Sequence, residues 1–187
     1  ADQTVSVSTT DDDVAGFTIT ETEGSTTVTE AGSTDTITVV LNAQPTSDVV
    51  IAISSSDISE SSVNSPLTFT AANWDTAQTV TVTGVDDDII DGDQGTTITI
   101  SVVDALSDDD FDALNDQTVA AITTDNDQAG FTVVEFGGST GVAESGTTDT
   151  FTVVLDAQPD SNVVITLTSD DTGEATVTST LTFTPAN

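Results

Sequence analysis

Hydrophobic and polar residues alternate with a period of two along much of the chain. In the clearest stretch, Ile37, Val39 and Leu41 alternate with Thr38 and Val40. The pattern returns in three further segments, 49–53, 79–83 and 97–102. Because successive side chains of a strand point to opposite faces, this alternation predicts strands that bury one face. Their many valine, isoleucine and threonine residues favour the same assignment.

Residues typical of turns lie between these strands, in segments 42–48, 73–77 and 86–95. The spacing predicts about seven short strands in each stretch of roughly 110 residues. Segment 104–115 is the one candidate helix. We therefore expect an all-β chain, built of Ig-like antiparallel β-sandwiches.

The chain repeats itself at an offset of 114 residues, without gaps. Ala15-Gly16-Phe17-Thr18 returns as Ala129-Gly130-Phe131-Thr132. Roughly 44 of the 73 overlapping positions are identical, which indicates a tandem repeat.

The repeat predicts three parts. Residues 1–14 match the closing strand of a preceding repeat, 15–127 form one complete repeat, and 128–187 match the first half of the next. We expect the chain to be a window on a longer tandem array, in which each repeat contacts its neighbours.

Composition narrows the chemistry. The chain has no Lys, Arg, His or Cys, and its 33 Asp and Glu residues give a net charge of -33. Binding to nucleic acids or anionic membranes needs Lys and Arg, so both are excluded. Without His and Cys the common nucleophile pairs and zinc sites are excluded too. We expect no enzymatic activity, because no pair of carboxylates stands out as catalytic. The regular apolar pattern argues against disorder.

The acidic residues gather at the predicted turns. The densest group is 86–94, directly after a predicted strand, and a second is 124–130, at the junction of two repeats. Asp11-Asp12-Asp13 is the copy of the second group. Two carboxylates 4 Å apart repel by about 1 kcal/mol even in water. Ca²⁺ binds about six to eight oxygen ligands, so these loops predict calcium sites, with a solvated acidic loop as the alternative.

At these residues the chain resembles the Calx-beta domain family. The resemblance rests on Glu30 before Gly32, the loop Asp86-Asp87-Asp88-Ile89-Ile90-Asp91, the closing Asp125-Asn126-Asp127, and the Ala-Gly-Phe that opens the next repeat. It covers the complete repeat and both partial ones. Members of the family are sandwiches that bind Ca²⁺ at one end, so the resemblance implies a calcium cluster at the junction end of each repeat.

The resemblance implies the calcium ligands Glu30, Asp86, Asp87, Asp91, Asp125, Asn126 and Asp127. Asp88 and Asp93 are further candidates, because Gln94 stands where the family often has an acidic residue. By the repeat, Asp11, Asp12, Asp13 and Glu144 belong to the equivalent sites of neighbouring repeats.

Two further features have two interpretations each. Segment 108–112 is either a flexible acidic loop or a second, weaker ion site. Trp74, the one tryptophan, either packs at the edge of the core or forms a platform for a sugar.

These observations predict a structural role. We expect a calcium-stiffened array of repeats in an extracellular or cell-surface filament, sheath or adhesin extension, with Ca²⁺, neighbouring repeats and other copies of the chain as partners. The alternatives are a module that binds a carbohydrate or protein, and a calcium-sensing regulatory domain.

Overall fold

The computed structural model describes residues 2–186, and its regular structure is β-strand with three short 3₁₀ turns. Nine strands form between residues 17 and 124: β1 Phe17–Glu21, β2 Thr26–Thr29, β3 Thr34–Leu41, β4 Val49–Ser55, β5 Ser61–Val63, β6 Leu67–Phe69, β7 Gln78–Gly84, β8 Gln94–Val102 and β9 Gln117–Thr124. The four segments with the clearest alternation lie in β3, β4, β7 and β8, as predicted.

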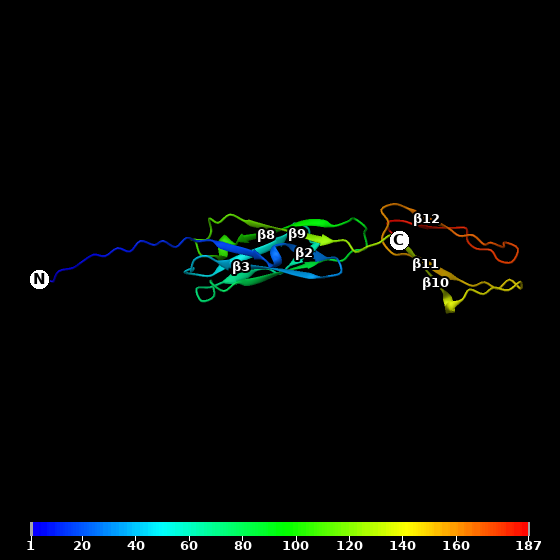
Figure 1. Ribbon diagram of the computed structural model, residues 1–187, viewed down its shortest axis with the longest axis horizontal. Helices are drawn as coiled ribbons and strands as arrows, with labels where there is room; N and C mark the ends of the chain where they lie inside the picture. Colours follow the sequence, from blue (N-terminus) through cyan, green and yellow to red (C-terminus); the bar gives the residue numbers. More distant parts are fainter. Residues whose placement is uncertain (1, 187) are drawn as a thin grey trace. The chain divides into compact units, whose positions relative to one another are not determined.

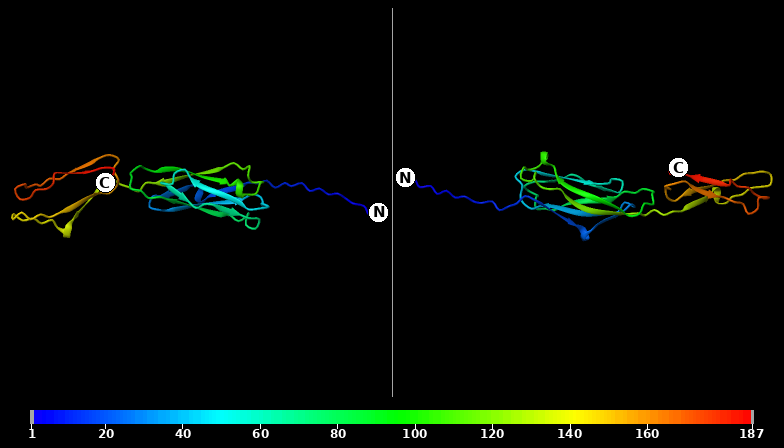
Figure 2. Two further views of the ribbon diagram at one scale, coloured as in Figure 1. Left: turned by 180° about the vertical axis from the view of Figure 1, so that it is seen from behind. Right: turned by 90° about the horizontal axis from the view of Figure 1, so that it is seen from above.

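These nine strands form two sheets that face each other (Figures 1 and 2). One sheet has the strand order β1-β3-β7-β5, and the other has the order β2-β9-β8-β4-β6. All neighbours are antiparallel except β2 and β9, which are parallel. The prediction of an all-β, Ig-like sandwich is confirmed.

The apolar side chains of the alternating segments fill the space between the sheets. Ile37, Val39, Val80, Val82, Ile98 and Ile100 are all fully buried. Trp74 is half-buried and packs against this core, as the first interpretation of its position predicted. The large buried apolar surface explains why a chain with so high a charge folds.

The prediction of a candidate helix at 104–115 is wrong. A single 3₁₀ turn, η2 (Asp104–Leu106), lies in this segment, and turns follow it. The carboxylate of Asp108 instead accepts hydrogen bonds from the backbone of Thr46 and Ser47 in another loop. An aspartate side chain that accepts hydrogen bonds from backbone N–H groups favours turns and loops over a helix.

Strands β2 and β7 approach unusually closely at Gly84. A Cβ atom on this residue would lie 2.1 Å from the backbone oxygen of Thr29, far inside van der Waals contact. Glycine is thus required here for packing. The contact fixes the end of β2, the strand that leads directly to Glu30.

The described chain divides into two compact units. The first comprises the residues up to Val85 together with Gln94–Thr124, and the second comprises Asp86–Asp93 together with the residues from Asp125 on. The predicted division at residues 14/15 and 127/128 stays a prediction.

The second unit contains four strands, β10 Phe131–Glu135, β11 Phe151–Leu155, β12 Val163–Thr166 and β13 Thr180–Phe183, and the turn η3 Phe136–Gly138. Its strand registers reproduce those of the first unit at the repeat offset. Phe131 pairs with Leu155 as Phe17 pairs with Leu41, and Val163 pairs with Phe183 as Val49 pairs with Phe69.

Candidate metal centre

Two parallel strand ends place the first two acidic residues of the site. In the β2–β9 ladder Thr29 is paired with Thr124, so the next residues, Glu30 and Asp125, leave the sheet side by side. The backbone N–H of Glu30 extends the ladder by donating to the oxygen of Thr124 at 3.2 Å. Glu30 is only 1% exposed. The parallel pairing therefore buries a carboxylate next to the start of an acidic loop.

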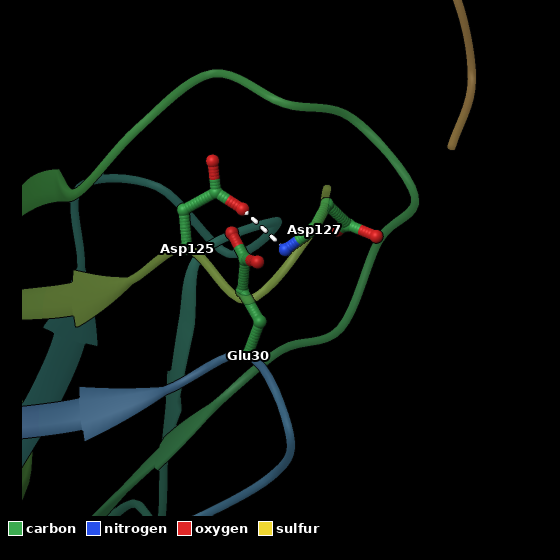
Figure 3. Close-up of side chains that lie close together, drawn as sticks. All are labelled: Glu30, Asp125 and Asp127. Carbon is green, nitrogen blue, oxygen red and sulfur yellow. Dashed lines mark hydrogen bonds between the residues drawn. The ribbon is translucent and has the colours of Figure 1, made fainter. Parts of the chain in front are cut away.

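A tight turn adds a third carboxylate. The backbone N–H of Asp127 donates to Oδ1 of Asp125 at 2.7 Å, which turns the chain back on itself (Figure 3). Carboxylate oxygens of Glu30, Asp125 and Asp127 then all lie within 4.8 Å of one another. The three side chains come from two chain segments, and each offers an oxygen ligand to one point in space.

The loop between β7 and β8 is tied to this turn. The backbone N–H of Gly92 donates to Oδ2 of Asp125 at 2.8 Å, and that of Asp125 donates to Oδ1 of Asp93 at 3.3 Å. Gly92 has a φ of 75°, a left-handed conformation that glycine adopts without strain. The acidic loop is thus connected by hydrogen bonds to Asp125, one of the three carboxylates.

The electrostatics of the site are unfavourable without a cation. Burial raises the pKa of Asp127, and the nearby charges of Asp125, Asp88, Asp86 and Asp87 raise it further. The buried Oδ2 atom of Asp127 has no hydrogen-bond partner. Buried polar atoms normally have a partner, and no Lys, Arg or His exists in this chain to supply one.

The donor set fits a hard metal ion. All the ligands on offer are oxygens, and Ca²⁺ prefers carboxylate and carbonyl oxygens in flexible geometry. The residues Glu30, Asp125 and Asp127 would hold such an ion directly. An ion at this point would give the buried Asp127 oxygen its missing partner and cancel part of the repulsion.

The structure brings together three of the predicted ligands and leaves the others around them. The group does not include the predicted ligands of the loop between β7 and β8, nor the one that lies between Asp125 and Asp127; these are Asp86, Asp87, Asp88, Asp91, Asp93 and Asn126. Asp87 uses Oδ1 to accept from the backbone N–H of Ile89 at 2.7 Å, which shapes its loop. These residues stay predicted ligands.

The predicted ligands of the neighbouring sites stand apart from any such group among residues 2–186. Asp11, Asp12 and Asp13 are exposed, although Asp13 N–H donates to Oδ1 of Asp11 at 3.1 Å, as Asp127 does to Asp125. Glu144, the counterpart of the buried Glu30, is exposed as well. The two repeat copies therefore form the same turn, but only the second belongs to a cluster of carboxylates.

Sequence reasoning missed Glu60, a second buried glutamate at this end of the sandwich. It is 8% exposed, and its backbone oxygen accepts from Val85 N–H at 2.9 Å and from the Thr123 hydroxyl at 3.0 Å. These two partners directly precede the acidic segments at Asp86 and near Asp125. The available signal was the repeat, since Glu174 stands 114 residues further on.

Asp108 has a structural role at the opposite end of β3. Its Oδ2 atom accepts from the N–H and hydroxyl of Thr46, at 2.6 and 2.8 Å, and from the N–H of Ser47 at 2.8 Å. Its Oδ1 accepts from the N–H of Asp110 at 3.1 Å. These bonds lower the pKa of Asp108 to about 2. The residue joins the β3–β4 loop to the β8–β9 loop, so neither interpretation of segment 108–112 describes it.

We expect Asp108→Asn to destabilise the chain by about 1–3 kcal/mol at neutral pH, because it weakens charge-assisted hydrogen bonds. An aspartate whose pKa is lowered by folding stabilises the folded state above its ordinary pKa, and this contribution is lost as the pH falls. In urea unfolding the wild type should therefore lose more stability between pH 4 and 2 than the variant does. The exposed neighbour provides the control, Asp109→Asn, and equal curves for both variants would contradict the assignment.

No family model matches this chain, and no curated protein matches it. Among solved structures it is similar to the apo form of the Calx CBD1 domain, with 15% identity, a TM-score of 0.40, and coverage of 59% of this chain and 98% of that chain. For the calcium-binding domain CBD12 of CALX1.1 the identity is 13%, the TM-score 0.42 and the coverage 83% of each chain.

The E. coli chaperone DraB is also similar, with 8% identity, a TM-score of 0.42, and coverage of 81% of this chain and 90% of that chain. Within residues 2–186 no helix has the length and apolar character needed to cross a bilayer. The chain is an all-β, Ig-like sandwich by its own structure, and likenesses this distant add no argument about its function.

Proposed function

We propose that this chain is a calcium-binding structural repeat, and that Ca²⁺ stiffens the connection between one repeat and the next. One observation carries the proposal. Three carboxylates converge where β9 leaves the sandwich, and the buried Oδ2 of Asp127 among them has no hydrogen-bond partner. The chain has no cationic side chain that would neutralise this group.

The position of the group explains how an ion would act. Asp125 and Asp127 belong to the segment that leads from β9 towards β10, and only Gln128 and Ala129 separate Asp127 from Gly130. Glu30, in contrast, is fixed by β2. An ion shared by all three would tie the connecting segment to the sandwich, whereas repulsion among the bare carboxylates would free it.

We propose further that the chain acts outside the cell, as part of a surface filament, sheath or adhesin extension, without catalysis. Sites made of a few carboxylates bind Ca²⁺ weakly, and extracellular modules with dissociation constants near 10⁻⁴–10⁻³ M are the usual examples. The tandem repetition supports this role, because an array gains length by adding near-identical units. Its partners are calcium ions and neighbouring repeats.

The alternative of a sugar-binding module loses its main support, because Trp74 packs against the core and is half-buried. A calcium-sensing domain stays an alternative, but no observation favours it over the structural role.

The proposal predicts that Ca²⁺ narrows the range of shapes that the full chain adopts. In small-angle X-ray scattering, the maximum dimension of the wild type should become better defined on addition of millimolar Ca²⁺. The variant Asp125→Asn with Asp127→Asn should keep a broad distribution, while its circular dichroism stays unchanged.

The matched control is Asp11→Asn with Asp13→Asn, which changes the exposed copy of the same turn. This control should respond to Ca²⁺ as the wild type does. A response of the Asp125/Asp127 variant equal to that of the wild type would refute the stiffening role.

A further inference from the structure

We propose that the acidic loop of one repeat, residues 86–93, binds to the receiving loop of the next repeat, residues 156–159, and that this contact forms the joint between the two repeats. In the sequence the acidic loop lies between β7 and β8 of the first sandwich. By its contacts, however, it belongs to the second unit, together with the residues from Asp125 on. A segment from the interior of one repeat is thus packed with the repeat that follows.

Main-chain atoms make the contact between the two loops. The backbone N–H of Gln158 donates to the oxygen of Asp88 at 2.6 Å, and Gln158 forms a parallel β-bridge with Ile89. Ile89 is half-buried, whereas its neighbours Asp88 and Ile90 are exposed. The N–H of Ile89 donates to Oδ1 of Asp87 at 2.7 Å, which holds the acidic loop in this shape. The acidic loop therefore pairs with the next repeat as an added strand would.

The receiving loop is built in the same way in both repeats. The side-chain amide of Gln158 donates to the oxygen of Pro185 at 2.7 Å, and that of its counterpart Gln44 donates to the oxygen of Ala71 at 2.8 Å. This side chain therefore shapes the loop, while the backbone N–H of Gln158 binds the acidic loop. Gln44 lies in the repeat that has all nine strands, and it is exposed there. A complete sandwich thus builds the same loop and leaves it accessible.

The other end of the acidic loop is bound to the candidate metal centre. Gly92 N–H donates to Oδ2 of Asp125, and Asp125 N–H donates to Oδ1 of Asp93. One loop thus contacts the three-carboxylate group through residues 92 and 93, and the next repeat through residues 88 and 89. An ion that holds Asp125 would also hold the acidic loop in the shape that binds the receiving loop. This coupling to calcium rests on the proposed function, but the contact itself does not.

Charge opposes the contact when no cation is bound. The acidic loop contains five aspartates, and Asp156 and Asp160 lie in or directly beside the receiving loop. The chain has no Lys, Arg or His that could offset them. Like charges repel, and salt at about 0.15 M screens the repulsion between exposed groups. We therefore expect the contact to be least populated in chelator at low salt and most populated in Ca²⁺.

Paired cysteines test the contact in the full chain, which has no Cys of its own. The variant Ile89→Cys with Gln158→Cys places thiols on the two residues of the β-bridge. Paired strands lie about 4.8 Å apart, a separation that a disulfide spans. The matched control is Ile90→Cys with Gln158→Cys, because side chains of adjacent residues in extended chain point to opposite sides.

Under mild oxidation of dilute protein in Ca²⁺, the bridge variant should form its intramolecular disulfide at least tenfold faster than the control. Both variants lose the same glutamine, so a difference in rate reports on the register of the acidic loop. Equal rates would show that the loop has no fixed register on the receiving loop and would overturn the proposal.

Hydrogen exchange tests the contact without any substitution. Gln158 and Gln44 both stand in the sequence Ala-Gln-Pro, so their amides have the same immediate neighbours. The acidic loop is bound to Gln158 and not to Gln44. By NMR in Ca²⁺, the amide of Gln158 should exchange at least tenfold more slowly than that of Gln44, and chelator at low salt should reduce the difference. Equal exchange in Ca²⁺ would overturn the contact. If Gln158 is protected equally in Ca²⁺ and chelator, the contact stands and its coupling to the proposed calcium site fails.

Discussion

Calcium should raise the melting midpoint of the full chain by several degrees, and Glu30→Gln should abolish most of this rise. A ligand that binds only the folded state at about 100 times its dissociation constant adds about 2.7 kcal/mol per site. Glu30 is the most deeply buried of the three converging carboxylates, and β2 holds it in place. Removing its charge takes away a ligand that no mobile loop can replace.

The chain supplies its own control for this experiment in Glu144→Gln. Glu144 is the repeat counterpart of Glu30, but it is exposed and outside any described carboxylate group. In dilute protein, thermal melts with Ca²⁺ and with chelator should therefore show a normal calcium response for Glu144→Gln. Equal midpoints of the wild type in calcium and chelator would exclude the site.

Asp127→Asn should have opposite effects in the two conditions. In chelator we expect the variant to melt a few degrees above the wild type, because it removes a charge that burial and four neighbouring aspartates disfavour. In saturating Ca²⁺ we expect it to melt below the wild type, because the ion loses a ligand. Few substitutions raise the melting midpoint in one condition and lower it in the other. Such a reversal would therefore identify Asp127 as a ligand of the ion.

Asp13→Asn is the matched substitution in the exposed copy of the turn. It should leave the melting midpoint of dilute protein nearly unchanged in both conditions. If Asp127→Asn destabilises the chain in chelator as well as in calcium, its carboxylate stabilises the loop by itself and the metal site is not needed to explain it.

Much of the fold could be predicted from the alternation of residues. The buried positions of β3 and β4 follow a period of two, and a shift by one residue would expose the whole apolar set. The short strands β5 and β6 were less predictable, because three residues are too few for an alternation to be recognised. The 104–115 segment was predicted wrongly because its backbone partners, Thr46 and Ser47, lie far away in the sequence.

By itself, the sequence determined the strand faces, the repeat, the oxygen-only chemistry and the two acidic loops, because all of these follow from residue type and local spacing. The tertiary structure decided which carboxylates meet. Glu30 reaches Asp125 only through the parallel pairing of β2 with β9, and the side-chain pattern of a strand does not say which strand lies beside it. Glu144 follows an equivalent segment, and among residues 2–186, where no strand is paired with that segment, its carboxylate is exposed.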